Sequence, residues 1–172
     1  MGGALAAIGA AVALGVPLAE AATCAGTLEP PPHRMSVRRT PDGLVLIDDS
    51  YNASPSATLA ALAVLRDAGT RRIAVLGDML ELGTLSSDAH EEVGQVAARS
   101  CDLLIGVGEL AATIVRVARQ EGLALGYRAQ DKAEALVLLR RLCRPGDTIL
   151  VKGSRALALD ELADALVAPA SA

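Results

Sequence analysis

Four short apolar runs, separated by segments with helical spacing, constrain this fold more than any other sequence feature. The runs are LVLI (44–47), IAVL (73–76), LLIGV (103–107) and TILV (148–151). Apolar runs of this length suit strands that are covered on both faces, as in a parallel sheet. Apolar residues at helical spacing predict helices over 56–68, 87–99, 109–121, 131–142 and 157–167. This alternation predicts an α/β fold with a parallel sheet and right-handed crossovers.

Two weaker signals add to the predicted sheet. Residues 34–39 and 44–48 read as strands joined by the turn Thr40-Pro41-Asp42-Gly43. A further strand is expected within 123–129. The predicted sheet is therefore mostly parallel, with a turn-connected pair of strands at its beginning.

The first 28 residues differ in character from the rest. Residues 1–19 are apolar and uncharged, and 17–27 read as a second short helix with Pro17 near its first turn. The opening run is either a helix packed on a larger body or a signal or membrane segment. A signal needs early basic residues, but the first basic side chain is Arg34. Because Gly15-Val16-Pro17 also interrupts the run, a packed helix is the preferred interpretation.

Three consecutive prolines, Pro30 to Pro32, separate these helices from the α/β part. Proline lacks an amide hydrogen and clashes with a preceding helical turn, so residues 29–32 predict a stiff linker or hinge. We place a boundary at 28–34, which divides the chain into a helical segment, 1–33, and an α/β domain, 34–172.

Composition and charge exclude several classes of function. Sixteen basic and twenty acidic residues give a net charge of −4, which offers no overall attraction to nucleic-acid phosphates. The absence of Phe and Trp removes the aromatic platforms that bind single-stranded bases. Cys24, Cys101 and Cys143 are far apart, which is typical of buried thiols in a reducing compartment. We therefore expect a cytoplasmic protein that binds no nucleic acid and has no membrane span.

Ligands of parallel α/β sheets bind at the carboxyl ends of the strands, so polar loops after the apolar runs are candidate sites. The first such loop is Asp48-Asp49-Ser50-Tyr51-Asn52. Neighbouring side chains on a strand point to opposite faces, so only one of the two aspartates can face a shared site. A carboxylate there suits ribose hydroxyls or a hydrated magnesium ion. The alternative is a polar turn without a ligand.

The second candidate loop is Gly77–Gly83. Its glycines bracket two acids, Asp78 and Glu81, and two apolar residues that look exposed, Met79 and Leu80, which indicates a shaped loop with close backbone approach. His90 follows on the next helix among acidic residues. The alternatives are a tight connector capped by Asp78 and a His90 that lies on the surface or caps the helix.

The third candidate loop is Lys152-Gly153-Ser154-Arg155. Lys152 and Arg155 beside the free amides of a following helix predict an anion site for phosphate or carboxylate, with Ser154 available as a cap. The alternative is two cations without a shared role. The sequence has no GxxxxGK[ST] phosphate loop, and Gly106-Val107-Gly108 lacks the third glycine of a dinucleotide-binding motif.

Together these segments resemble the Mur ligases. Pro32-His33-Arg34-Met35, LIDDSYNASP, VLGDMLELG followed by His90, and LVKGSR occur in the order found in that family. The likeness runs from about residue 3 to residue 167. The combination of DDSYNA, GDM-x-ELG and KGSR favours the member of the family that adds D-Ala-D-Ala to UDP-MurNAc-tripeptide.

The resemblance implies three domains: one for the UDP-sugar substrate, a central ATPase domain and a Rossmann-like C-terminal domain. This chain resembles the last helices of the central domain (1–33) followed by the C-terminal domain (34–172), so the other domains would be missing partners. The implied reaction uses ATP and Mg²⁺. The tripeptide carboxylate attacks the γ-phosphate to give an acyl phosphate, and the amine of D-Ala-D-Ala then displaces phosphate.

The resemblance also implies roles for the nucleotide-facing residues. Arg34 resembles the hinge arginine that reaches the ATP phosphates, and a catalytic role is expected for it. Asp49 resembles the aspartate that holds the ribose hydroxyls. Tyr51 and Asn52 belong to the same nucleotide-facing loop.

A second group of residues is expected near the incoming dipeptide. Lys152, Ser154 and Arg155 would lie toward the dipeptide or its carboxylate, and Lys152 is expected to take part in catalysis. Asp78 and His90 would shape the same cleft and bind substrate.

The sequence also departs from the family pattern. The P-loop, the magnesium ligands and the carbamylated lysine of the central domain lie outside it, and Gly3 stands where an asparagine is usual. We therefore expect the chain alone to be an incomplete ligase. Two rival hypotheses are a stand-alone module that binds a nucleotide or amino acid without catalysis, and a structural remnant that binds neither.

Overall fold

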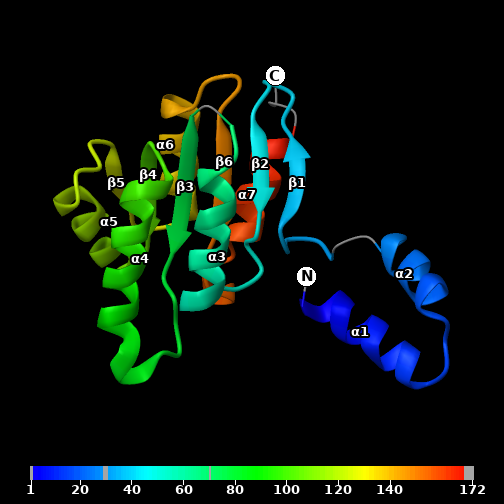
Figure 1. Ribbon diagram of the computed structural model, residues 1–172. Helices are drawn as coiled ribbons and strands as arrows, with labels where there is room; N and C mark the ends of the chain where they lie inside the picture. The colour runs from blue at the N-terminus through cyan, green and yellow to red at the C-terminus, as the bar shows by residue number, and fades with distance from the viewer. Residues whose placement is uncertain (1, 29–30, 70, 169–172) are drawn as a thin grey trace. The chain divides into compact units, whose positions relative to one another are not determined.

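The computed structural model describes residues 2–28, 31–69 and 71–168. The chain divides into two compact units, Met1–Pro31 and Pro32–Ala172 (Figure 1). This division falls within the predicted 28–34 boundary, in which Glu29 and Pro30 lie outside the described residues.

The N-terminal unit is a pair of helices, α1 (Gly2–Ala13) and α2 (Leu18–Gly26). Gly15 in their connection has a φ of +93°, a conformation that glycine adopts without steric cost. A hollow of about 410 Å³ between the helices is lined mostly by apolar side chains, and Leu5, Leu14 and Leu18 are exposed. In the described parts of the chain, no helix has the length and apolar character that crossing a membrane requires.

The second unit is built on a six-stranded sheet with the order β1-β2-β6-β3-β4-β5. Its strands are β1 (Ser36–Arg39), β2 (Val45–Asp48), β3 (Arg72–Gly77), β4 (Leu103–Val107), β5 (Gly126–Ala129) and β6 (Thr148–Lys152). β1 pairs antiparallel with β2, and every other pair is parallel. The predicted α/β fold with a mostly parallel sheet is confirmed, including the weak strand within 123–129.

Helices cover both faces of this sheet (Figure 1). One face carries α3 (Pro55–Arg66), α4 (Ser86–Ser100) and α5 (Ala111–Gln120); the other carries α6 (Lys132–Leu142) and α7 (Leu159–Val167). The connections from β2 through β5 all advance in one direction, so right-handed crossovers place their helices on one face. The return from β5 to β6 reverses that direction and places α6 on the opposite face.

Each face of the sheet has its own apolar core. In β3, Ala74 and Leu76 pack toward α3 to α5, whereas Ile73 and Val75 pack toward α6 and α7. All four side chains are essentially fully buried. Burial on both faces explains why the strands read as uninterrupted apolar runs rather than as alternating sequences.

Helices α4 and α5 approach each other closely at Gly94 of α4. A Cβ atom at this position would lie 2.8 Å from the Ile114 carbonyl oxygen and 2.8 Å from Val117 Cβ. Both distances are shorter than a van der Waals contact, and neither neighbour is the end of a flexible side chain. Glycine therefore sets the spacing of these two helices.

The three thiols differ in exposure, which corrects the expectation that all are buried. Cys24 is exposed, Cys101 is buried and Cys143 is intermediate, and all three are free. Burial, with the nearby Asp102 charge, raises the pKa of Cys101 to about 12. Burial, with the nearby Asp147 charge, raises the pKa of Cys143 to about 12.

These differences predict selective modification by a thiol reagent. At pH 8 we expect iodoacetamide to label Cys24 rapidly in the native protein, while Cys101 and Cys143 react only after unfolding in urea. A pKa near 12 instead of 9.0 lowers the thiolate population about a thousandfold at that pH. Peptide mass spectrometry over time measures the three rates, with Cys24→Ser as the control that removes the fast phase. Equal native rates for Cys24 and Cys101 would contradict the prediction.

Candidate functional site

The loops after three strands emerge together at one edge of the sheet. β6 lies between β2 and β3, with Asp48 opposite Val151 and Leu76 opposite Lys152. The carboxyl ends of these strands are therefore neighbours, and the loops that follow them can contact one another. These are the three loops identified from the sequence.

A buried ion pair joins the loops after β2 and β6. The Lys152 side chain is 3% exposed, and its Nζ donates to Asp49 Oδ2 (2.5 Å) and to the Asn52 carbonyl oxygen (3.0 Å). The other carboxylate oxygen of Asp49 accepts a hydrogen bond from the Met35 amide (3.1 Å). The structure differs here from the anion site expected of Lys152 with Arg155, because Asp49 balances the Lys152 charge.

Two arginines lie beside one exposed aromatic ring. The guanidinium carbon of Arg34 is 4.0 Å from the centroid of the Tyr51 ring, and that of Arg155 is 5.2 Å from the same centroid. Tyr51 is 40% exposed, and Arg155 also pairs with Asp160 at 3.2 Å. The attraction of a cation to a ring face stabilises both contacts. The hinge segment, the β2 loop and the β6 loop thus form a cationic surface around Tyr51.

Ser154 connects the β6 loop to the β3 loop. Its Oγ accepts a hydrogen bond from the Leu80 amide (2.9 Å), and its amide donates to the Asp78 carbonyl oxygen (3.0 Å). The expected capping role for Ser154 is wrong, because its side chain makes no cap hydrogen bond to the 3₁₀ turn η2 (Arg155–Leu157). A Cβ on Gly153 would lie 3.1 Å from Gly77 Cα, so the close backbone approach predicted for the Gly77–Gly83 loop is present at its first residue.

Asp78 is a buried support of helix α5. Its Oδ1 accepts a hydrogen bond from the Ala111 amide (2.7 Å), at the first residue of that helix. A carboxylate at a helix N-terminus is favoured by the free amides and the helix dipole. Asp78 therefore acts as a capping residue, as the alternative interpretation had it, and the helix it caps is α5. The Asp78 side chain is only slightly accessible.

His90 is a buried support of the β3 loop. Its Nδ1 lies 2.6 Å from the Ser86 carbonyl oxygen, to which it must donate, and its Nε2 accepts from the Met79 amide (3.1 Å). His90 and Met79 are each 1% exposed, so the alternative of a surface His90 and the expected exposure of Met79 are both wrong. Because both ring nitrogens are bonded within the chain, His90 holds the loop in shape and has no nitrogen left for a ligand.

Two carboxylates at this edge, Asp48 and Asp49, are bonded to protein partners, whereas Glu81 of the β3 loop is exposed. Asp49 binds Lys152 and Met35, and Asp48 binds Arg38, His33 and Ser50. Magnesium sites in proteins are built from carboxylate oxygens together with water and phosphate. The described loops therefore offer cations and a ring to a ligand, and the bonded Asp48 and Asp49 do not form a magnesium site by themselves.

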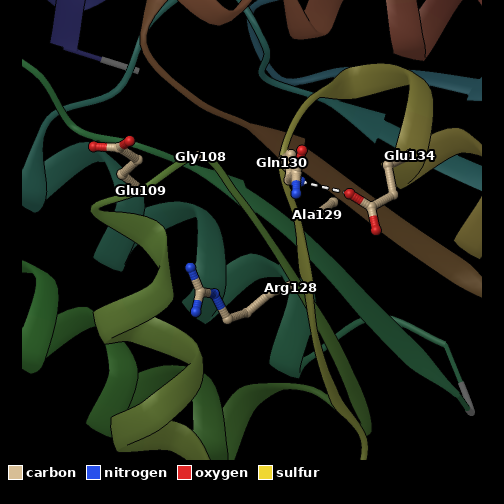
Figure 2. Close-up of a pocket in the computed structure, with 6 residues that line it drawn as sticks. All are labelled: Gly108, Glu109, Arg128, Ala129, Gln130 and Glu134. Atoms are coloured by element: carbon tan, nitrogen blue, oxygen red, sulfur yellow. Dashed lines mark hydrogen bonds between the residues drawn. The ribbon is translucent and has the colours of Figure 1, made fainter.

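The structure also contains a hollow that the sequence did not predict (Figure 2). It has a volume of about 510 Å³, lies at the carboxyl ends of β4 and β5, and is lined by Gly108, Glu109, Arg128, Ala129, Gln130 and Glu134. Glu134 Oε2 accepts from the Gln130 amide (2.8 Å). Helices α5 and α6 leave these two strands on opposite faces, which opens a crevice at the sheet edge. None of the sequence-predicted site residues lines this hollow.

The fold and the position of these loops define a Rossmann-like α/β domain with its candidate ligand site at the carboxyl ends of β2, β6 and β3. The chain belongs to the Mur ligase family, because residues 33–155 match the family model described as "Mur ligase, glutamate ligase domain". The resemblance found in the sequence is thereby confirmed.

Individual relatives agree with this family. The chain is 40% identical over 155 residues to the UDP-N-acetylmuramoyl-tripeptide–D-alanyl-D-alanine ligase of Mycobacterium leprae, covering 78% of this chain and 30% of that protein. A crystal structure of MurF from Acinetobacter baumannii matches 95% of this chain and 36% of its own, with 30% identity and a TM-score of 0.79. MurF from Thermotoga maritima in complex with ADP has 26% identity and a TM-score of 0.75, covering 91% of this chain and 35% of that one. The chain thus spans about a third of the length of these relatives.

Proposed function

We propose that this chain is the C-terminal part of a cytoplasmic, ATP-dependent ligase that adds D-Ala-D-Ala to UDP-MurNAc-tripeptide in peptidoglycan synthesis. Family membership and the names of the relatives support this proposal. The observation that carries it is the gathering of Arg34, Tyr51 and Arg155 beside the Asp49–Lys152 pair. Cations and an aromatic ring at the carboxyl ends of parallel strands suit a phosphorylated nucleotide.

The proposal divides the ligase between this chain and other domains. Residues 34–172 act as the C-terminal domain, and residues 1–33 belong with the central ATPase domain. Because the chain spans about a third of its relatives, the phosphate loop and the magnesium ligands are assigned to the remaining two thirds. The exposed Leu5, Leu14 and Leu18 suit helices that pack on such a domain. The chain alone is then inactive as a ligase.

Each site residue takes a role that its contacts support. Arg34 and Arg155 are the exposed cations, and we assign them to the phosphates or to a substrate carboxylate. Asp49 keeps lone pairs for ribose hydroxyls while Lys152 and Met35 hold it in place. We therefore assign Lys152 a positioning role rather than direct catalysis. In such a ligase, catalysis consists largely of positioning and charge neutralisation.

The remaining site residues shape the loops that face the dipeptide. Tyr51 supplies the ring at the nucleotide, and the Asn52 carbonyl helps to fix Lys152. Ser154 bonds the β6 loop to the β3 loop, and Asp78 and His90 bond the β3 loop to α5 and α4. We propose that their influence on D-Ala-D-Ala binding acts through the shape of these loops.

Isothermal titration calorimetry of the 172-residue chain with ATP, and separately with D-Ala-D-Ala, tests this proposal. We expect weak ATP binding that Arg34→Ala reduces about tenfold, because one charge-assisted contact contributes about 1.5 kcal/mol. Arg39→Ala is the matched control, since Arg39 is an exposed arginine of β1 with no recorded partner among the described residues. Equal losses from Arg34→Ala and Arg39→Ala would contradict the Arg34 assignment.

A second experiment separates the ligase from a binding module. Supplying the central and N-terminal domains of a relative in trans should restore ATP hydrolysis that depends on Arg34 and Asp49. Ligand binding without any restored hydrolysis would favour a stand-alone binding module. A folded chain that binds neither ATP nor D-Ala-D-Ala would overturn the proposed function.

A further inference from the structure

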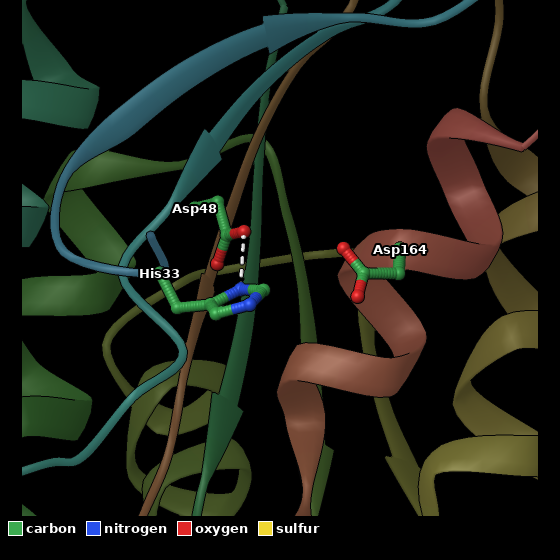
Figure 3. A group of neighbouring side chains, drawn as sticks. All are labelled: His33, Asp48 and Asp164. Carbon is green, nitrogen blue, oxygen red and sulfur yellow. Dashed lines mark hydrogen bonds and ion pairs between the residues drawn. The ribbon is translucent and has the colours of Figure 1, made fainter. Parts of the chain in front are cut away.

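A buried carboxylate ties the segment after the prolines to the sheet. The Asp48 side chain at the end of β2 is 1% exposed, and it accepts hydrogen bonds from Arg38 Nη2 (2.5 Å), Ser50 Oγ (2.6 Å) and His33 Nδ1 (2.9 Å). A carboxylate only accepts, so His33 Nδ1 carries the hydrogen. Figure 3 shows this bond between His33 and Asp48, with Asp164 facing them from α7. His33 is thus fixed by a group that is itself held at several points.

The charge around this carboxylate is already balanced by an arginine. Arg38 donates from Nη2 to Asp48 and from Nη1 to Asp164 (2.7 Å). His33, Asp48 and Asp164 could in principle hold a metal ion, since their ligand atoms lie within 4.8 Å of one another. The guanidinium of Arg38 already supplies a positive charge to both carboxylates. These contacts therefore hold the segment around His33 against the sheet and do not form an ion site.

The backbone on both sides of Arg34 is strained. His33 has a φ of +60° and Met35 a φ of +55°, although neither residue is glycine. A left-handed conformation is unfavourable for such a residue and persists only where its surroundings impose it. The His33 carbonyl accepts from the Tyr51 amide (3.1 Å), and the Met35 amide donates to Asp49 Oδ1 (3.1 Å). Arg34 therefore stands between two strained residues that are both bonded to the loop after β2.

We propose that His33 and Asp48 are positioning residues that hold residues 33–35 in this strained conformation, with the Arg34 guanidinium over the Tyr51 ring. Neither side chain contacts a ligand in this proposal. Asp48 fixes the imidazole, the imidazole fixes the backbone of residue 33, and the backbone directs Arg34. An effect on nucleotide affinity rests on the proposed function of Arg34. The positioning of Arg34 over the Tyr51 ring does not depend on that function.

Two substitutions at residue 33 separate the side-chain bond from the backbone conformation. Asparagine tolerates a positive φ, and its amide nitrogen is attached to Cγ as His33 Nδ1 is, so His33→Asn can keep the bond to Asp48. Glycine also tolerates a positive φ but has no side chain to bond Asp48. Both variants leave Asp48 and Arg38 paired, which protects the fold better than a change of the buried Asp48.

The readout is the ring-current shift of the Arg34 side-chain protons, measured by NMR in a Tyr127→Leu background where Tyr51 supplies the single benzene ring of the chain. Tyr51→Leu defines the unshifted position. We expect the upfield shift to be lost in His33→Gly and retained in His33→Asn. A folded His33→Gly protein that keeps the full shift would overturn the positioning role.

Nucleotide affinity, measured by calorimetry with ATP, then distinguishes the two proposals. We expect His33→Gly to weaken binding about three- to tenfold, because the competent arrangement of Arg34 becomes a minor population, and His33→Asn to restore it. Loss of the ring-current shift without loss of ATP affinity would support the positioning of Arg34 and contradict its role in binding the nucleotide.

Discussion

Replacing Lys152 with methionine is expected to lower the free energy of unfolding by about 3–5 kcal/mol, because it leaves the Asp49 carboxylate without its buried partner. Lys152 is 3% exposed and Asp49 15% exposed, so water compensates the lost contact poorly. Urea denaturation followed by far-UV circular dichroism measures the change. The length of the methionine side chain preserves most of the packing of the lysine stem.

The other lysine of the chain provides a matched control. Lys132 pairs with Glu161 on the surface, where the two side chains are 35% and 67% exposed. An exposed pair contributes about 0–1 kcal/mol, so Lys132→Met should change stability little. Adding Asp49→Asn to Lys152→Met removes the unpaired charge and should recover about 2 kcal/mol. Equal effects of the two lysine substitutions would show that Lys152 is not a buried ion-pair partner.

Gly94→Ala is expected to destabilise the protein by about 1–3 kcal/mol, through overpacking between α4 and α5. Helix propensity alone predicts the opposite sign, since alanine in a helix interior is favoured over glycine by about 1 kcal/mol. The steric effect prevails because the new methyl group would lie 2.8 Å from the Ile114 carbonyl oxygen.

The same helix supplies the control for this substitution. Gln95 is the exposed neighbour of Gly94 on α4. In urea denaturation, Gln95→Ala should change the free energy of unfolding by less than about 0.5 kcal/mol. A Gly94→Ala protein more stable than the unmodified chain would show that α4 and α5 separate at little cost.

The alternation of strands and helices was predictable because it depends on local pattern. The runs around Val75 and Leu150 are buried on both faces, so they stand out in the sequence without any knowledge of the fold. The N-terminal cap of α3 depends on local sequence in the same way, because the Ser54 side chain accepts a hydrogen bond from the Ala57 amide three residues later. β5 was the weakest prediction, since it is a four-residue edge strand that includes Gly126 and an exposed Arg128.

The partners of the site residues were not predictable in the same way. Lys152 and Asp49 are 103 positions apart, and they meet only because β6 lies next to β2 with Val151 opposite Asp48. Strand order depends on tertiary packing, and the local sequence of either loop contains no signal for it. The burial of His90 on α4 was not predictable for the same reason, because its Nε2 accepts a hydrogen bond from the Met79 amide in the β3 loop.

One missed contact did have a signal. The turn at Thr40–Gly43 sets the register of β1 against β2, and this register pairs Ser36 with Asp48. Arg38 lies two residues further along the same strand and therefore on the same face as Ser36, a diagonal neighbour of Asp48. The Arg38–Asp48 pair could thus have been inferred from the hairpin once its register was known.

The central place of β6 has a consequence for synthesis of the chain on the ribosome. β6 is the last strand in the sequence but pairs with both β2 and β3 in the middle of the sheet. Until residue 152 has emerged, β2 and β3 each have an unpaired edge, and the hairpin of β1 and β2 has no strand pairing with the β3-α4-β4-α5-β5 part. Local contacts can form first in each of these two parts, and the nascent sheet is most exposed to aggregation just before its final strand inserts.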